Sequence, residues 1–260
     1  MLTKYILLML VIAVLFVSGC VQQQNPIELI KQANQKQTGL NYIIEYSIKT
    51  EKMINSDPSV HEYKEVFYKS GDKIKNQVIV EDSVRHETIK NELGVFVCTY
   101  FAQNDILCIP VPNSDEISNE DALKTLLAGG AIKSTISEKE LSVGGKNRKC
   151  NNIELYADLP SLTQEKFKVI DSALGIEGGE YETSIIKEIK SSLCLDEETG
   201  VLLESRTFTR FDAPYLDDVV DVSGSLIKTA TKLTTNPDFS DRDFQVPENA
   251  AIEEFPEDSV

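Results

Sequence analysis

Alternation of apolar and polar residues is the feature that most restricts the fold of this chain. In the segment 42–48, Tyr42, Ile44, Tyr46 and Ile48 occupy every second position. Successive side chains of a β-strand point to opposite faces, so this spacing predicts a strand with one buried face. Similar segments, separated by short turns, follow at 61–69, 73–81, 84–90, 94–101 and 105–111. The sequence therefore predicts an antiparallel meander.

Helices and a second group of strands are predicted around this meander. Asn25, Pro26 and Glu28 form a helix start, and the helix is expected to end near Gly39 with Ile27, Ile30 and Ala33 on its apolar side. Two further helices are predicted at 118–129 and 161–175, each beginning at a serine and ending at a glycine. A hairpin at 194–211, a long strand at 219–233 and a short extended return at 237–250 complete the pattern.

The N-terminal residues have the features of an exported and anchored protein. Lys4 precedes an apolar run at 5–17, and the small residues Ser18 and Gly19 precede Cys20. The run is shorter than the roughly 20 residues of a membrane-spanning helix, so residues 1–19 are predicted to be a removable signal peptide. Val17-Ser18-Gly19-Cys20 resembles the lipobox of prokaryotic lipoproteins, which implies that Cys20 becomes the lipidated N-terminus. A plain signal peptide or an uncleaved anchor is the alternative.

Anchoring through lipid also agrees with the charge of the chain. Residues 20–24 would form a short lipidated spacer, and two or more acyl chains would hold the protein stably at the membrane. The formal net charge of −16 would repel nucleic acid and anionic headgroups. We therefore expect the protein to be lipid-anchored on the extracytoplasmic face of the cell membrane, with no nucleic-acid partner. We also expect it to be a monomer.

The cysteines other than Cys20 predict two disulfides. Cys98, Cys108, Cys150 and Cys194 are an even number in an exported chain, which favours disulfide pairing. A hairpin folded about residues 103–104 places Cys98 opposite Cys108. The remaining pair is then Cys150 with Cys194, each on the more polar face of its predicted strand. A structural zinc site is the alternative, although closely spaced C-x2-C pairs are absent from the sequence.

The order of the predicted elements resembles the LolA/LolB-like lipoprotein-carrier superfamily, which includes LppX/LprG-type lipoproteins. The resemblance covers the leading helix, LNYIIEYSIKT, the strands, the helical interruption, CLDEETGVLLESRTFT and DFSDRDFQVPEN. Its closest local matches are Asp196, Thr199, Gly200 and Leu203, and then Phe244 and Pro247. The resemblance implies an α+β fold, in which a strongly curved antiparallel β-sheet forms an open half-barrel with helices covering the concave face. It implies a single LolA-like half-barrel domain at 25–250, followed by an acidic tail at 251–260.

An apolar concave face must be covered, because a large exposed apolar patch is a liability. The side chains predicted to line it are Tyr42, Ile44, Tyr46, Tyr63, Phe67, Val78, Val80, Phe96 and Tyr100. The resemblance implies that the cavity binds a lipid or lipidated protein, in a carrier or sensor role. If the two predicted helices are lids, Gly129-Gly130 and Gly178-Gly179 are the expected hinges, and if the helices fill the mouth, these glycines are only helix stops and turns. The alternative is a cell-surface scaffold or protein-interaction module whose core is filled and which takes no ligand.

Catalytic chemistry is not predicted. The two histidines, His61 and His86, each lie beside a glutamate in a predicted strand, and common nucleophile, metalloprotease and phosphate-binding motifs are absent. Acidic clusters at 115–121, 217–221 and 238–243 could offer oxygen ligands to Ca²⁺, but they lack the glycine of an EF-hand loop. We therefore expect no enzyme, no cofactor and no metal site.

Overall fold

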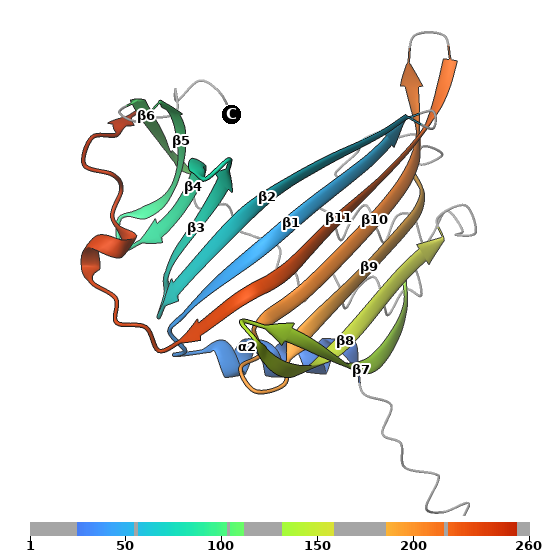
Figure 1. Ribbon diagram of the computed structural model, residues 1–260, viewed down its shortest axis with the longest axis horizontal. Helices are drawn as coiled ribbons and strands as arrows, with labels where there is room; N and C mark the ends of the chain where they lie inside the picture. The colour runs from blue at the N-terminus through green and yellow to red at the C-terminus, as the bar shows by residue number, and fades with distance from the viewer. Residues whose placement is uncertain are drawn as a thin grey trace, which may run out of the picture.

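A single twelve-stranded sheet dominates the structure (Figure 1). The structure, a computed structural model, describes residues 25–54, 57–102, 105–111, 132–158, 186–215 and 218–253. The strand order is β12-β6-β5-β4-β3-β2-β1-β11-β10-β9-β8-β7, and the sheet is strongly curved and unclosed. The predicted half-barrel architecture is confirmed to this extent. The helices predicted at 118–129 and 161–175, with the two glycine pairs, lie outside the described residues, so a covering of the concave face by helices stays a prediction.

Two groups of consecutive strands form the sheet. The predicted meander is confirmed as β1 (Tyr42–Ile54), β2 (Asp57–Ser70), β3 (Lys73–Val80), β4 (Ser83–Asn91), β5 (Gly94–Ala102) and β6 (Asp105–Val111). The second group is β7 (Lys133–Val143), β8 (Lys146–Asp158), β9 (Ile186–Asp196), β10 (Leu202–Tyr215) and β11 (Asp218–Thr235). Antiparallel pairing of β1 with β11 joins the two groups, although these strands lie far apart in the sequence.

The leading helix, α2 (Pro26–Gln37), lies against the turn between β9 and β10. Its predicted cap is present, because the Asn25 side chain accepts a hydrogen bond from the Ile27 N–H. Its buried side chains are Pro26, Leu29 and Ala33, so the apolar side differs from the predicted one, which included Ile27 and Ile30. The helix backbone approaches Gly200 so closely that a Cβ on Gly200 would lie 2.3 Å from the Ala33 carbonyl oxygen.

The β9–β10 turn is built by the residues of the D-x-x-T-G segment. The Asp196 carboxylate accepts hydrogen bonds from the Thr199 backbone N–H and hydroxyl, at 2.9 and 2.5 Å. Arg148 donates to the same carboxylate at 3.2 Å. Gly200 follows with φ at +73°, a conformation that glycine adopts without strain. These residues therefore fix the conformation of the turn against which α2 packs.

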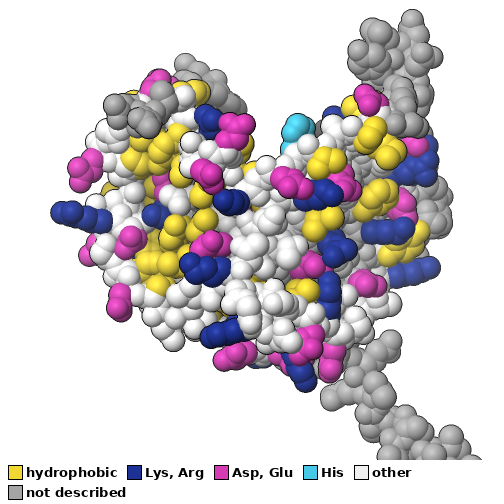
Figure 2. All heavy atoms as spheres, in the orientation of Figure 1, with side chains coloured by type: hydrophobic (Ala, Val, Ile, Leu, Met, Phe, Trp, Pro, Cys, Tyr) yellow, Lys and Arg dark blue, Asp and Glu magenta, His cyan; other side chains and the backbone are white. Residues whose placement is uncertain are grey.

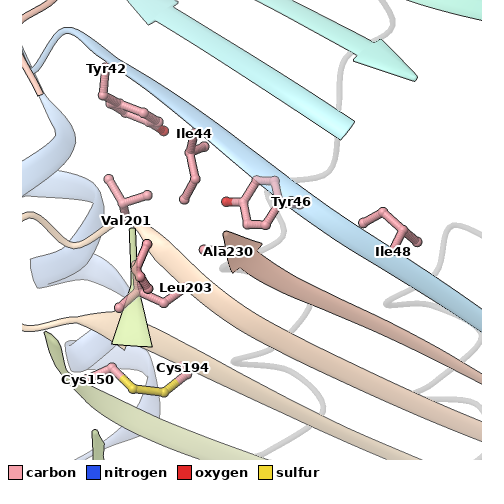
Figure 3. Close-up of a cluster of buried hydrophobic side chains, with 10 residues drawn as sticks. Tyr42, Ile44, Tyr46, Ile48, Cys150, Cys194, Val201, Leu203 and Ala230 are labelled. Carbon is pink, nitrogen blue, oxygen red and sulfur yellow. A yellow bond between two sulfur atoms is a disulfide. The ribbon is translucent and has the colours of Figure 1, made fainter. Parts of the chain in front are cut away.

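Two buried clusters hold the sheet. Figure 3 shows most of the first cluster, in which β1 side chains face Val201, Leu203 and the Cys150–Cys194 disulfide. Its buried members are Tyr42, Ile44, Tyr46, Ile48, Val143, Cys150, Cys194, Val201, Leu203 and Ala230. The second cluster comprises Ile89, Cys98, Ile106 and Cys108, with Phe96, Tyr100, Val246 and Ala250 packed against it.

The chain after β11 packs beside the second cluster. It includes a short 3-10 helix, η2 (Asp241–Phe244), and a parallel strand, β12 (Ala251–Ile252), paired with β6. Phe244 is 2 % exposed and contacts Phe239 at a ring distance of 5.1 Å. Asn91 of β4 donates to the Phe244 carbonyl at 2.9 Å. This segment was predicted to be extended with a loose tail from residue 251, but the sheet includes residues 251 and 252.

Both predicted disulfides are present. Cys98 and Cys108 stand directly opposite each other in the β5–β6 ladder. Cys150 and Cys194 are diagonal neighbours, because Cys150 faces Asp196 and Cys194 faces Asn152 across β8 and β9. All four are 0 or 1 % exposed. Cys150 and Cys194 are predicted to lie on the more polar face of their strands, but their bridge belongs to the first buried cluster.

Candidate ligand-binding face

The side of β2, β1, β11 and β10 that carries Tyr46 is the candidate site, and we name it the inner face. Two interactions on this side bridge strands that are not neighbours. The Tyr46 hydroxyl of β1 donates to the Leu202 carbonyl of β10 at 2.7 Å, passing over β11. Lys228 of β11 pairs with Glu65 of β2 at 2.5 Å, across β1. These bridges are possible because the sheet curls toward this face.

The inner face is closed at the end nearest α2. Tyr42, Ile44, Tyr46 and Ile48 are between 0 and 5 % exposed. The Tyr42 hydroxyl donates to the Gln37 side chain of α2 at 3.0 Å, and burial raises the pKa of Tyr42 to about 12. This end of the half-barrel is therefore a packed core.

Tyr46 can cross the inner face because two local features make room for it. Its cross-strand neighbour on β11 is Ala230, whose small side chain leaves space for the ring. The register also shifts at both ends of the Tyr46–Leu202 hydrogen bond, between Glu45 and Tyr46 in the β1–β11 ladder and between Leu202 and Glu204 in the β9–β10 ladder. Burial, followed by the nearby Tyr42 and Glu65, raises the pKa of Tyr46, so its hydroxyl stays a neutral donor.

Beyond Tyr46 the inner face carries an ion pair. Lys228 lies 4.1 Å above the centre of the Tyr46 ring while it binds Glu65, and 19 % and 13 % of the two charged side chains remain exposed. Across the ladders, Lys228 is flanked by Ile48 of β1 and Ser205 of β10. Two opposite charges thus lie on the wall, with one apolar and one hydroxyl-bearing neighbour beside Lys228.

Past the ion pair the inner face becomes more open. Leu226 is 38 % exposed, and it is flanked by Thr50 on β1 and Thr207 on β10. A hollow of about 290 Å³ is lined here by Glu51, Lys52, Thr207, Thr209, Val222, Ser223, Gly224, Ser225 and Leu226. Gly224 stands between Lys52 and Thr209 in the register, and its missing side chain widens the hollow.

Most of the residues predicted to line the wall share the inner face. Register places Tyr63 and Phe67 of β2 opposite Ile48 and Ile44, and both are half-buried. Val78 faces Glu65, and Val80 follows it with the same alternation. Together with Tyr42, Ile44 and Tyr46, seven of the nine predicted wall residues are brought to this face.

Phe96 and Tyr100 are not on this wall. Through Ile89 and Lys75, the register aligns Phe96 with Tyr68, which follows Phe67 and therefore points to the opposite face. Tyr100 alternates with Phe96 and donates to the buried Glu87 carboxylate. Both residues pack on the second cluster, so their prediction as wall residues was wrong.

Charged and apolar side chains are interleaved on the visible surface (Figure 2). One hollow of about 440 Å³ lies over β8 to β11 and has Tyr156, Phe208 and Ile227 among its lining residues. Lys190 lies within 5.9 Å of both aromatic ring centres and pairs with Glu188 at 2.5 Å. The cations here are largely matched by neighbouring carboxylates.

The residues considered for catalysis and metal binding are separate from one another. His61 and His86 are exposed, and His86 Nδ1 lies 3.3 Å from the Thr99 hydroxyl. Within the described ranges, histidine, cysteine and carboxylate side chains do not gather in groups of three suited to a metal ion. The described helices also include none with the length and apolar character needed to cross a membrane.

Comparison with known proteins gives only remote similarity in structure. No family model matches the chain, and no curated protein matches it. Its structure is similar to the Pseudomonas aeruginosa MucA/MucB complex, with 10% identity, TM-score 0.42, and coverage of 86% of this chain and 61% of the other. It is also similar to the Mycobacterium tuberculosis lipoprotein LppX, with 11% identity, TM-score 0.37, and coverage of 83% of this chain and 97% of LppX.

A third similar structure is an outer membrane lipoprotein-sorting protein domain from Vibrio parahaemolyticus. It has 12% identity and a TM-score of 0.31, over 84% of this chain and 95% of that domain. The chain spans less than two thirds of the MucA/MucB chain that it matches. The similar structures thus include one lipoprotein and one lipoprotein-sorting domain, both with TM-scores below 0.5.

Proposed function

We propose that this protein is a membrane-anchored, extracytoplasmic lipoprotein that binds an apolar ligand on the inner face of its half-barrel, as a carrier or sensor. The ligand would be a lipid or the lipid chain of another protein. The observation that supports this most is the change along the inner face from packed side chains at Tyr46 to a partly exposed Leu226 beside a hollow. An acyl chain could cover the apolar surface that remains there.

Anchoring at Cys20 supports the same function. Cys20 lies five residues before Asn25, and a fully extended chain spans at most about 3.6 Å per residue. The α2 end would therefore stay close to the bilayer. Metabolic labelling with an alkyne palmitate analogue should tag the chain, and Cys20→Ala should abolish the tag. Equal labelling of both forms would contradict the anchor.

Lipid extraction tests the ligand. The full chain is purified from a bacterial envelope, washed in detergent and extracted with organic solvent, and its lipids are quantified by mass spectrometry. Leu226→Asp places a charge on the inner face, and Leu93→Asp places the same charge at an 83 % exposed position in the β4–β5 turn. We expect near-stoichiometric lipid with the wild type and Leu93→Asp, and a large loss with Leu226→Asp.

A scaffold with a filled core is the second candidate, and the packed α2 end supports it. Tyr42, Ile44 and Ile48 leave almost no surface for a ligand. If lipid content is negligible in the wild type and both variants, the scaffold is the better account. Equal lipid content in all three would show adventitious lipid and would count against the carrier as well.

A further inference from the structure

The ion pair on the inner face points to the kind of head group that the ligand carries. We propose that Lys228 and Glu65 bind an uncharged polar head that offers both a hydrogen-bond acceptor and a donor, such as the hydroxyl and ester of a monoacylglycerol. This inference rests on the proposed function and specifies the ligand class. It disfavours ligands with an isolated carboxylate, such as free fatty acids.

The unused hydrogen-bonding capacity of the pair is the first argument. A lysine ammonium has three donors, and Glu65 is the one hydrogen-bond acceptor recorded for Lys228 among the described residues. The Glu65 carboxylate uses Oε1 in this bond, and no partner of its Oε2 is recorded in the same part of the chain. Both side chains keep some exposure, so a ligand can reach the remaining donors and acceptor.

The charge of the site is the second argument. The positive charge of Lys228 is already balanced by Glu65 at 2.5 Å. A ligand carboxylate would compete with Glu65 for the Lys228 ammonium. The Glu65 carboxylate would also repel it, because like charges repel each other strongly where water is scarce. A hydroxy ester instead accepts from Lys228 and donates to Glu65 without adding charge.

The surroundings of the pair are the third argument. Ser205 flanks Lys228 on β10, and Thr50 and Thr207 follow one step further along the face, beside the hollow at Gly224. A glycerol-like head at the pair could bond the Ser205 hydroxyl, which leaves the hollow beside Leu226 to the acyl chain.

Competition in native mass spectrometry tests this selectivity. The full chain in detergent is given equimolar monostearoylglycerol and stearate, which share one acyl chain and differ in the head. We expect the monoacylglycerol adduct to exceed the stearate adduct by at least about tenfold, a difference that one charge repulsion of about 1.4 kcal/mol would produce. Glu65→Gln keeps the shape of the side chain and should reduce that ratio by about tenfold through increased stearate binding.

Two further variants complete the test. Lys228→Met should weaken both adducts, because the shared donor is lost. Glu62→Gln, which removes an exposed carboxylate from the other face of β2, should leave the ratio unchanged. A wild-type ratio near one that Glu65→Gln does not alter would overturn the head-group inference while the carrier function stands. Absence of both adducts in every form would overturn the carrier function and the inference with it.

Discussion

Replacing Gly200 by alanine tests how the helix closes one end of the half-barrel. The new Cβ would lie 2.3 Å from the Ala33 carbonyl oxygen and 2.7 Å from the Ala33 Cα. These are backbone atoms of α2, so the clash is relieved only if the helix moves away from the β9–β10 turn. That movement would weaken the hydrogen bonds from Lys36 to the Glu197 carbonyl and from Gln37 to the Gly200 carbonyl.

The expected loss of stability follows from these contacts. A left-handed backbone costs a non-glycine residue roughly 1–2 kcal/mol. Each weakened hydrogen bond adds about 0.5–1.5 kcal/mol. We therefore expect Gly200→Ala to lower the free energy of unfolding by roughly 2–5 kcal/mol, with a fall of about 2–4 °C in unfolding temperature per kcal/mol.

Gly145→Ala is the matched control for this substitution. Gly145 has nearly the same φ, +75°, but a Cβ there would meet nothing within 4 Å. It should therefore show only the backbone strain, about 1–2 kcal/mol. Both variants are compared by denaturant unfolding with the disulfides intact. An equal loss in the two variants would refute the close approach of α2 to the turn.

Two further predictions concern the chain that packs after β11 and the ion pairs. Phe244→Ala should cost about 3–5 kcal/mol and should speed hydrogen exchange in β3 and β4 but not in β8 and β9, since Phe244 is 2 % exposed and η2 contacts β3 and β4; uniform exchange changes would contradict it. Burial acts to raise the pKa of Glu204, but hydrogen bonds from Lys139 and Arg206 outweigh it and lower that pKa. A lowered pKa stabilises the folded state above the unfolded-state value of about 4.3, and this contribution disappears as the pH falls through the folded value. The difference in unfolding temperature between wild type and Glu204→Gln should therefore be largest near pH 7 and shrink at acidic pH, and a constant difference would argue against the ion pair.

Local sequence patterns predicted the meander because each of its contacts lies between consecutive strands. The turns are short, so period two and turn residues together determine the pairing of β1 to β6. The Cys98–Cys108 bridge follows from the same hairpin. The D-x-x-T-G segment also predicted its turn correctly, since its hydrogen bonds are local.

The placement of Phe96 and Tyr100 could not be read from alternation alone. The segment from Val95 to Phe101 is apolar on both of its faces, so period two does not choose between them. The face that buries these aromatics is packed by a segment far along the chain, around Val246. One signal was present, because Cys98 shares their alternation and a disulfide prefers a covered position.

The ion pair of the inner face was missed for a related reason. Lys228 and Glu65 come together only through the pairing of β1 with both β2 and β11, which local patterns do not determine. A hint was available in β11, where Lys228 alternates with the apolar Leu226 and Ala230. A charge within an apolar alternation is a reason to look for a partner or a ligand.

Photo-crosslinking in the cell tests most directly whether acyl chains occupy the inner face. Cells that express the full chain are fed a fatty acid with a diazirine in its acyl chain, so that their lipids become photoreactive. After irradiation, crosslinked peptides are mapped by mass spectrometry. We expect adducts at inner-face residues such as Tyr63 and Leu226, and none at Phe96 and Tyr100 on the other face. Adducts confined to the lipidated N-terminus, or equal on both faces of the sheet, would contradict this expectation.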